Sequence, residues 1–85
     1  MAARKRIHEI FEDVDFNGKF RRAESGWWIA YCEEVPEART QGETIEEARE
    51  NLRDAIGFIL EDFTDEELEE LKESIVSVRS ETLAL

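Results

Sequence analysis

Carboxylates are the groups through which this sequence could do chemistry, because 22 of its 85 residues are Asp or Glu. A two-metal hydrolase needs several carboxylates that converge on metal ions about 3.5–4 Å apart, and acids carried by strands suit that geometry. The expected strands offer only Glu24, Glu33 and Glu43, each near a strand end. The other acids fall in expected helices or turns. We therefore predict that the protein is not an enzyme.

Metal and thiol chemistry are equally limited, since the chain has one histidine, His8, and one cysteine, Cys32. A zinc or iron–sulfur site built from Cys and His needs about four such ligands. We expect His8 to face solvent or to cap a helix, and Cys32 to be a small buried apolar residue. A single cysteine cannot form an internal disulfide, which is compatible with a reducing compartment. We expect no cofactor, no metal and a cytoplasmic location.

The net charge of the chain indicates which classes of partner it can bind. The chain has 11 basic and 22 acidic side chains, a formal net charge of −11. Non-specific nucleic-acid binding needs cations against phosphate, so we expect no direct binding to nucleic acid and a basic or apolar protein partner instead. No apolar run approaches the ~18–20 residues that span a bilayer, and the N-terminus lacks an apolar stretch of signal-peptide length. A membrane role is not expected.

The acidic character is concentrated in one segment, residues 44–73, which holds twelve acidic and three basic side chains for a net charge of −9. That segment has helical periodicity. Its acids are interpreted either as a solvated helix face or as a surface for an electropositive partner, whose approach opposite charge would accelerate. The length of 85 residues fits one domain over residues 1–85, with a thin core.

The first expected element is a short helix over residues 3–13, because apolar residues recur at i, i+3, i+4 and i+7 (Ile7, Ile10, Phe11 and Val14). Residues 15–18 have turn chemistry, since Asn and Gly tolerate positive φ. A strand is expected over residues 19–24.

The strongest strand pattern covers residues 27–33, which are rich in aromatic side chains. Both faces of this strand are largely apolar, so a helix or a second chain should cover each of them. Trp27 and Trp28 are adjacent and must point to opposite faces. One is expected in the core, and the other lies either under a helix or against a partner.

The second half of the chain predicts a short third strand, two helices and a possible fourth strand. Pro36 ends the second strand, and residues 38–43 can form the third. Residues 45–62 hold helical spacing over about five turns, with a capping box of Thr44 and Glu47. Gly42 is interpreted as a bend residue before this cap. A second capping box, Thr64 and Glu67, opens a helix over 65–74, and residues 75–78 have the composition of a strand.

Residues 25–62 resemble the HicB-type antitoxin family. The family pattern is a Gly-aromatic strand, an acid–apolar–Pro bend, a Thr-Gln-Gly-acid-Thr segment and a helix that opens with Glu and Ala. The matching residues are Gly26, Trp28, Ala30, Glu34, Val35, Pro36, Thr40, Gln41, Gly42, Glu43, Thr44, Glu47, Ala48, Asn51 and Leu52. Glu37 departs from the pattern, because the family has a glycine after the proline.

The resemblance implies an α+β fold similar to a partial ribonuclease H fold, in which an antiparallel sheet of three to four strands packs on one long helix. The expected order is α-β-β-β-α-α-β. The resemblance also implies the role of an antitoxin that binds and occludes a small basic, mRNA-cleaving toxin of the HicA type. Longer relatives carry a C-terminal DNA-binding module, and this chain is expected to be a short form without one.

An RNA-binding toxin must present a basic surface, so the surface that covers it should be acidic with an apolar centre. The candidate residues are Glu33, Glu34 and Glu37 at the end of the second strand, flanked by Trp28 and Tyr31. We expect charge reversal of Glu33 and Glu34 to leave the fold intact, and the acidic helix face ranks second. The doubly apolar strand predicts a homodimer or higher oligomer. The alternative function is an orphan homo-oligomeric HicB-like interaction domain with a structural or adaptor role and no toxin.

Overall fold

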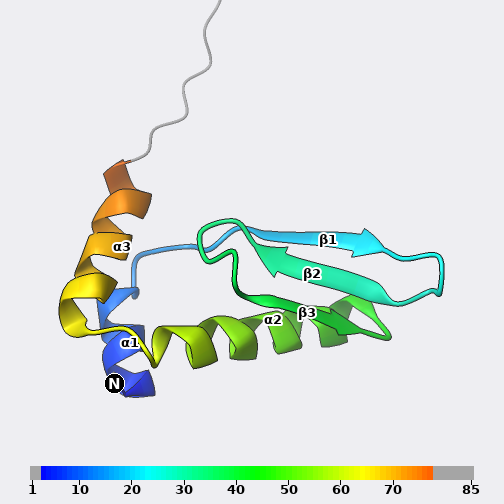
Figure 1. The fold of residues 1–85 in the computed structure, drawn as a ribbon, viewed down its shortest axis with the longest axis horizontal. Coiled ribbons are helices and arrows are strands. Elements are labelled where there is room, and N and C mark those ends of the chain that lie inside the picture. Colours follow the sequence, from blue (N-terminus) through cyan, green and yellow to red (C-terminus); the bar gives the residue numbers. More distant parts are fainter. Residues whose placement is uncertain (1–2, 78–85) are drawn as a thin grey trace, which may run out of the picture.

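Three helices and three strands make up the part of the chain that the structure, a computed structural model, describes: residues 3–77 (Figure 1). They follow one another in the order α-β-β-β-α-α. The elements are α1 (Arg4–Ile10), β1 (Gly18–Arg22), β2 (Trp28–Cys32), β3 (Arg39–Gly42), α2 (Ile45–Leu60) and α3 (Asp65–Ser77).

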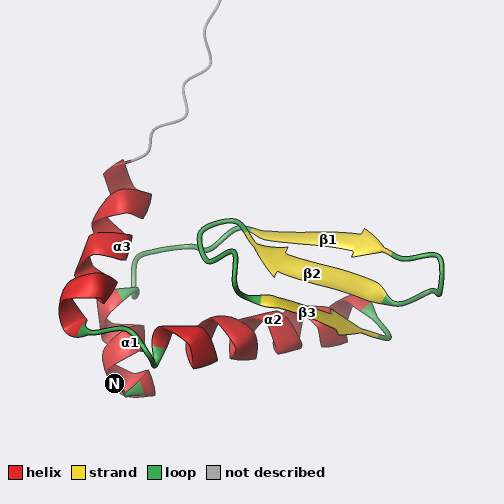
Figure 2. Cartoon of the chain, in the orientation of Figure 1, coloured by secondary structure: helices red, strands yellow, loops and turns green. Residues whose placement is uncertain are grey.

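The strands form one antiparallel sheet with the order β1-β2-β3 (Figure 2). The register places Phe20 opposite Ala30, and Ala30 opposite Thr40. Such directly paired residues point to the same face of a sheet. The α+β architecture with a three-stranded antiparallel sheet is therefore confirmed.

The long helix α2 packs along one face of the sheet, while α1 and α3 lie together near its C-terminal end, beyond the strands (Figure 1). The core follows this arrangement. Ala30 and Cys32 from β2 meet Ala48 and Leu52 from α2, and Leu60 continues the core toward α1 and α3. All five side chains are buried, so one apolar cluster joins the sheet to the helices.

Both predicted helix caps are present. The Thr44 hydroxyl accepts from the backbone N–H of Glu47 at 3.1 Å, but the Glu47 carboxylate accepts from the N–H of Glu43 rather than of Thr44. The second box is reciprocal: Thr64 Oγ1 accepts from the N–H of Glu67 at 3.2 Å, and Glu67 Oε1 accepts from the N–H of Thr64 at 3.0 Å. These bonds satisfy N–H groups that a helix start leaves unpaired.

The possible fourth strand is wrong, because residues 75–77 continue α3 and Val78 lies outside the described residues. Leu68, Leu71 and Ile75 lie at helical spacing and pack on the core, with Leu68 fully buried. Burial of this stripe outweighs the preference of Ile and Val for strands, which is weak and dependent on context. Helix α1 is also shorter than expected and ends at Ile10.

Position 42 requires a glycine because β3 and α2 pack closely there, and not only because a bend precedes the helix cap. A Cβ at this residue would lie 2.5 Å from the backbone nitrogen of Ala48 and 2.9 Å from its Cα. The end of β3 therefore passes almost in contact with the first turns of α2. Nearby, the side-chain amide of Asn51 donates to the carbonyl of Gln41 at 2.9 Å, which ties the same two elements together.

Candidate functional site

The structure divides the predicted partner-binding residues between the two faces of β2. Trp28 shares a face with Ala30 and Cys32, and it packs partly buried against the core under α2. Tyr31 points to the opposite face and is 40% exposed. The expected flanking of the acids by both aromatics is therefore corrected: Trp28 is a packing residue on the α2 face, and only Tyr31 is available at the surface.

The three glutamates after β2 also differ from one another. Glu33 is exposed, and its carboxylate lies 3.3 Å from the Lys19 ammonium on β1. Glu37 is exposed in the bend before β3. Glu34 is partly buried, and its carboxylate accepts from the backbone N–H and the side-chain amide of Asn17, both at 2.7 Å. Glu34 thus fastens the bend to the segment that leads into β1.

Electrostatics at this junction agree with a structural role for Glu34. Burial would raise the pKa of its carboxyl, but the hydrogen bonds from Asn17 outweigh burial and leave that pKa below the usual value. The Cys32 thiol lies 3.4 Å from Glu34 Oε1, and burial raises its pKa, so Cys32 is a protonated core residue at neutral pH. Reversing the charge of Glu34 would place a cation against two hydrogen-bond donors. We therefore expect the Glu34 half of the Glu33 and Glu34 double reversal to disturb the fold, contrary to the expectation from the sequence.

Glu34→Gln should lower the free energy of unfolding by about 1 kcal/mol at neutral pH. The variant replaces a partly hydrated carboxylate with a neutral amide, so the charge-assisted hydrogen bonds from Asn17 are lost. A carboxyl whose pKa is lower when folded stabilises the fold fully above its unfolded pKa. That contribution disappears as the pH falls through the folded pKa. Urea unfolding from pH 7 to pH 3 should therefore show wild type and Glu34→Gln converging in acid. The exposed Glu37→Gln is the matched control, and curves that stay parallel would contradict this role.

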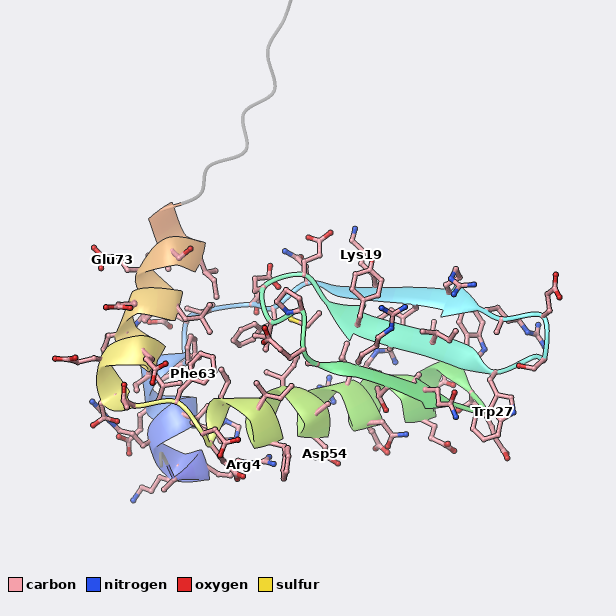
Figure 3. All side chains as sticks on the ribbon, viewed as in Figure 1. Arg4, Lys19, Trp27, Asp54, Phe63 and Glu73 are labelled. Atoms are coloured by element: carbon pink, nitrogen blue, oxygen red, sulfur yellow. The ribbon has the colours of Figure 1, made fainter. Side chains whose placement is uncertain are left out.

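The face of the sheet opposite α2 is open in the described part of the chain, where the helices lie along the other face or beyond the strands (Figure 1). By register, Lys19, Tyr31 and Arg39 form one row across this face, and Arg21, Ile29 and Gln41 form the next. Trp27 precedes β2 and continues the same face, 38% exposed. Figure 3 shows Lys19 on β1 and Trp27 at the far end of the sheet. We call these seven residues the open face.

The open face carries three cations and three large apolar side chains, which the sequence reasoning did not bring together. The Arg39 guanidinium lies 5.9 Å from the centre of the Tyr31 ring, within cation–π range. Lys19 and Arg21 alternate along β1, which was a visible signal for one shared face. Their proximity to Arg39 was not visible, because it depends on the register of three strands.

A second surface, the Phe58 patch, comprises Asp54 and Phe58 on the outer side of α2 and Asp62 in the turn after the helix. Phe58 is 67% exposed, and Asp54 is its neighbour one helical turn earlier. Asp54 points away from the strands in Figure 3, close to Arg4 of α1. All three side chains are exposed, and the Arg4 guanidinium donates to the Asp54 carbonyl at 3.5 Å. The acidic helix face is visible in the sequence, but the exposure of Phe58 within it is not.

Helix α1 supplies cations that pair with part of the acidic helices. Arg4 Nε lies 2.5 Å from the carboxylate of Glu61, and the Arg6 guanidinium lies 3.9 Å from Asp65 and from Glu69. These pairs are solvent-exposed and individually weak. They orient α1 toward α3 and the end of α2.

A groove of about 910 Å³ separates α1 and the segment after it from β1 and α2. Phe16, Phe20, Leu52 and Ile56 contribute its apolar surface. Among residues 3–77, no three His, Cys, Asp or Glu side chains gather closely enough to hold a metal ion. Within the same residues, no helix is both long and apolar enough to cross a membrane.

Comparison with known proteins gives one partial match. Over 40 residues the chain is 50% identical to a UPF0150 protein of Synechocystis sp.. The aligned segment covers 47% of this chain and 56% of that protein, so the chain spans little more than half the length of this curated relative. No family model matches the sequence, and no solved structure matches it. The chain is therefore similar, over about half of its length, to a UPF0150 protein.

Proposed function

We propose that this chain is a HicB-type antitoxin-like module, which captures a small basic ribonuclease of the HicA type and covers its RNA-binding surface. UPF0150 proteins are commonly linked to HicB-like proteins, which supports the proposal. The observation that carries it is the Phe58 patch. An exposed aromatic side chain beside an exposed acid has the chemistry that a basic RNA-binding surface would accept.

The residues that carry the HicB resemblance have structural roles consistent with a shared fold. Ala30 and Ala48 are fully buried where β2 meets α2. Gly42 allows the close approach of β3 to α2, and Asn51 donates to a β3 carbonyl. The pattern thus describes the β2–β3–α2 unit, on whose outer side the Phe58 patch lies.

The geometry changes the order of the two candidate surfaces. Glu33 is paired with Lys19 and borders the cations of the open face, and Glu34 is held by Asn17. The Phe58 patch combines exposed charge and apolar area on one helix face. It therefore becomes the first candidate for toxin contact, ahead of Tyr31, Glu33 and Glu37. Inhibition would act by occlusion, with no reactive group supplied.

The test uses a HicA-type ribonuclease encoded beside this chain, mixed with the purified protein in an mRNA cleavage assay. Wild type should suppress cleavage stoichiometrically. Phe58→Ala should weaken capture by roughly thirtyfold, as expected for an aromatic residue at the centre of an interface. Asp54→Lys should slow association most at low salt, where charges are screened least.

Glu46→Lys is the matched control, because it makes the same charge change on an exposed residue in the first turn of the same helix. It should affect capture far less than Asp54→Lys. Equal losses would mean that only net charge matters, and unchanged capture by Phe58→Ala would exclude this patch. A ribonuclease that the wild-type protein does not inhibit would contradict the proposed function itself.

The alternative function is a homo-oligomeric interaction domain without a toxin, and the uncovered sheet face is the observation that favours it. Light scattering at micromolar concentration distinguishes the two when combined with the cleavage assay. Self-association without inhibition of a neighbouring ribonuclease would support the alternative.

A further inference from the structure

We propose that the open face of the sheet binds single-stranded nucleic acid, with bases against its aromatic side chains and phosphates against its cations. This inference is independent of the proposed toxin capture, which uses the outer side of α2. It also differs from the expectation drawn from net charge alone.

The charge of the protein is segregated by face. Although the chain carries −11 overall, the open face holds Lys19, Arg21 and Arg39 and includes no Asp or Glu among its seven residues; Glu33, beside the face, pairs with Lys19. These seven residues therefore carry a positive charge, on a protein that is strongly acidic as a whole. Phosphate contacts depend on cations within reach, since charges farther than about 8–10 Å are largely screened at physiological salt.

The open face presents flat aromatic side chains on which bases can stack. Trp27 and Tyr31 are 38% and 40% exposed, and Ile29 lies between them on the same face. Exposed aromatic side chains on a sheet let successive bases stack without regard to sequence. The Arg39 guanidinium lies over the Tyr31 ring, 5.9 Å from its centre, so the pair offers a planar cation on which a base can stack and which a phosphate can reach.

The size of the open face favours a nucleic-acid strand over a second copy of this chain. Three strands about 4.8 Å apart and five residues at about 3.3 Å each cover roughly 14 by 16 Å. A stable protein interface buries about 800 Å² on each partner, several times this area. A few nucleotides fit such a face. If two open faces packed together, their cations would also lie against one another and repel.

Binding is measured by fluorescence anisotropy with labelled octauridylate and octathymidylate, from 20 to 200 mM salt. We expect the logarithm of affinity to fall with the logarithm of salt with a slope of about −2, because three single-strand phosphate contacts contribute about 0.7 each. Arg21→Glu should weaken binding roughly tenfold and make the slope shallower.

Arg22→Glu is the matched control, because Arg22 is the next residue of β1, is exposed and points to the α2 face. It makes the same change in net charge and should bind almost as wild type does. Thermal melts of both variants establish that each is folded. Equal losses in the two variants, or no binding by wild type at 20 mM salt, would overturn the proposal.

The two adjacent tryptophans give a second readout. In Trp28→Phe the remaining tryptophan, Trp27, lies on the open face, and octauridylate should quench its fluorescence. In Trp27→Phe the remaining Trp28 packs under α2 and should respond little. Equal responses would overturn stacking on the open face.

Two further outcomes would also overturn the proposal. Preferential binding of polyglutamate would indicate an acidic protein partner. A dimer by light scattering that Arg21→Glu abolishes would indicate a second copy of this chain.

Discussion

Gly42→Ala should lower the free energy of unfolding by about 3 kcal/mol, measured by urea denaturation followed by circular dichroism at 25 °C. The added Cβ would lie 2.5 Å from the backbone nitrogen of Ala48, in the first turns of α2. Because the clashing atoms are backbone, the contact is relieved only if β3 and α2 move apart. That movement would disturb buried Ala48 and the Asn51 hydrogen bond to β3. A loss of this size is a large share of the roughly 4–13 kcal/mol expected for a domain of this length.

Gly57→Ala provides the comparison, since its added Cβ would also lie 2.5 Å from a neighbouring atom. Here the neighbour is the end of the Arg4 side chain, which can rotate away. Alanine also favours a helix over glycine by about 0.5–1 kcal/mol. The stability of Gly57→Ala should therefore stay within about 1 kcal/mol of wild type. If Gly42→Ala is as stable as Gly57→Ala, the close approach of β3 to α2 is wrong.

Leu60→Ala should lower the free energy of unfolding by about 2–5 kcal/mol, because it removes a fully buried side chain and leaves a cavity. Leu60 lies at the end of α2, in the cluster that also includes Ile7 of α1 and Leu68 of α3. Its loss should loosen the packing of both terminal helices on α2. Urea denaturation measures the loss, and the midpoint should fall without a large change in slope.

Phe58→Ala serves as the control, because it removes a larger apolar side chain two residues earlier in the same helix. Phe58 is 67% exposed, so its truncation should change stability by about 0.5 kcal/mol or less. A loss as large as that of Leu60→Ala would mean that Phe58 is buried and is not part of a docking surface. The same measurement thus validates Phe58→Ala as a folded variant for the toxin-capture assay.

Local signals were sufficient to predict the principal elements. The helix predicted over 45–62, which the structure ends at Leu60, follows from apolar residues at helical spacing and from the Thr44 cap, which depend on neighbours within a few residues. The second strand follows from its aromatic side chains, and the second capping box marks the start of α3. Each of these signals acts over one or two turns of chain, so no tertiary contact is needed to detect it.

The end of α3 was not predictable from the same kind of signal. Residues 75–77 are compatible with a strand by composition and with a helix by the spacing of Leu68, Leu71 and Ile75. Burial of that stripe against the core decided in favour of the helix. Gly42 illustrates a similar limit: its place before the cap suggested a bend, whereas its contact with Ala48 depends on how tightly two elements pack.

The sequence by itself determined which side chains are available for chemistry: 22 acids, one histidine, one cysteine, and several aromatic side chains in one strand. Alternation required Trp27 and Trp28 to face opposite ways, but only the tertiary structure decided which face α2 covers. The same packing left Tyr31 exposed, and the hydrogen bonds from Asn17 gave Glu34 a structural role. Strand register brought Arg21 and Arg39 onto the open face, and the packing of α2 left Phe58 exposed beside Asp54. The open face joins residues that are far apart in the chain, and the exposure of the Phe58 patch depends on which side of α2 the other elements cover. Tertiary packing decides both surfaces.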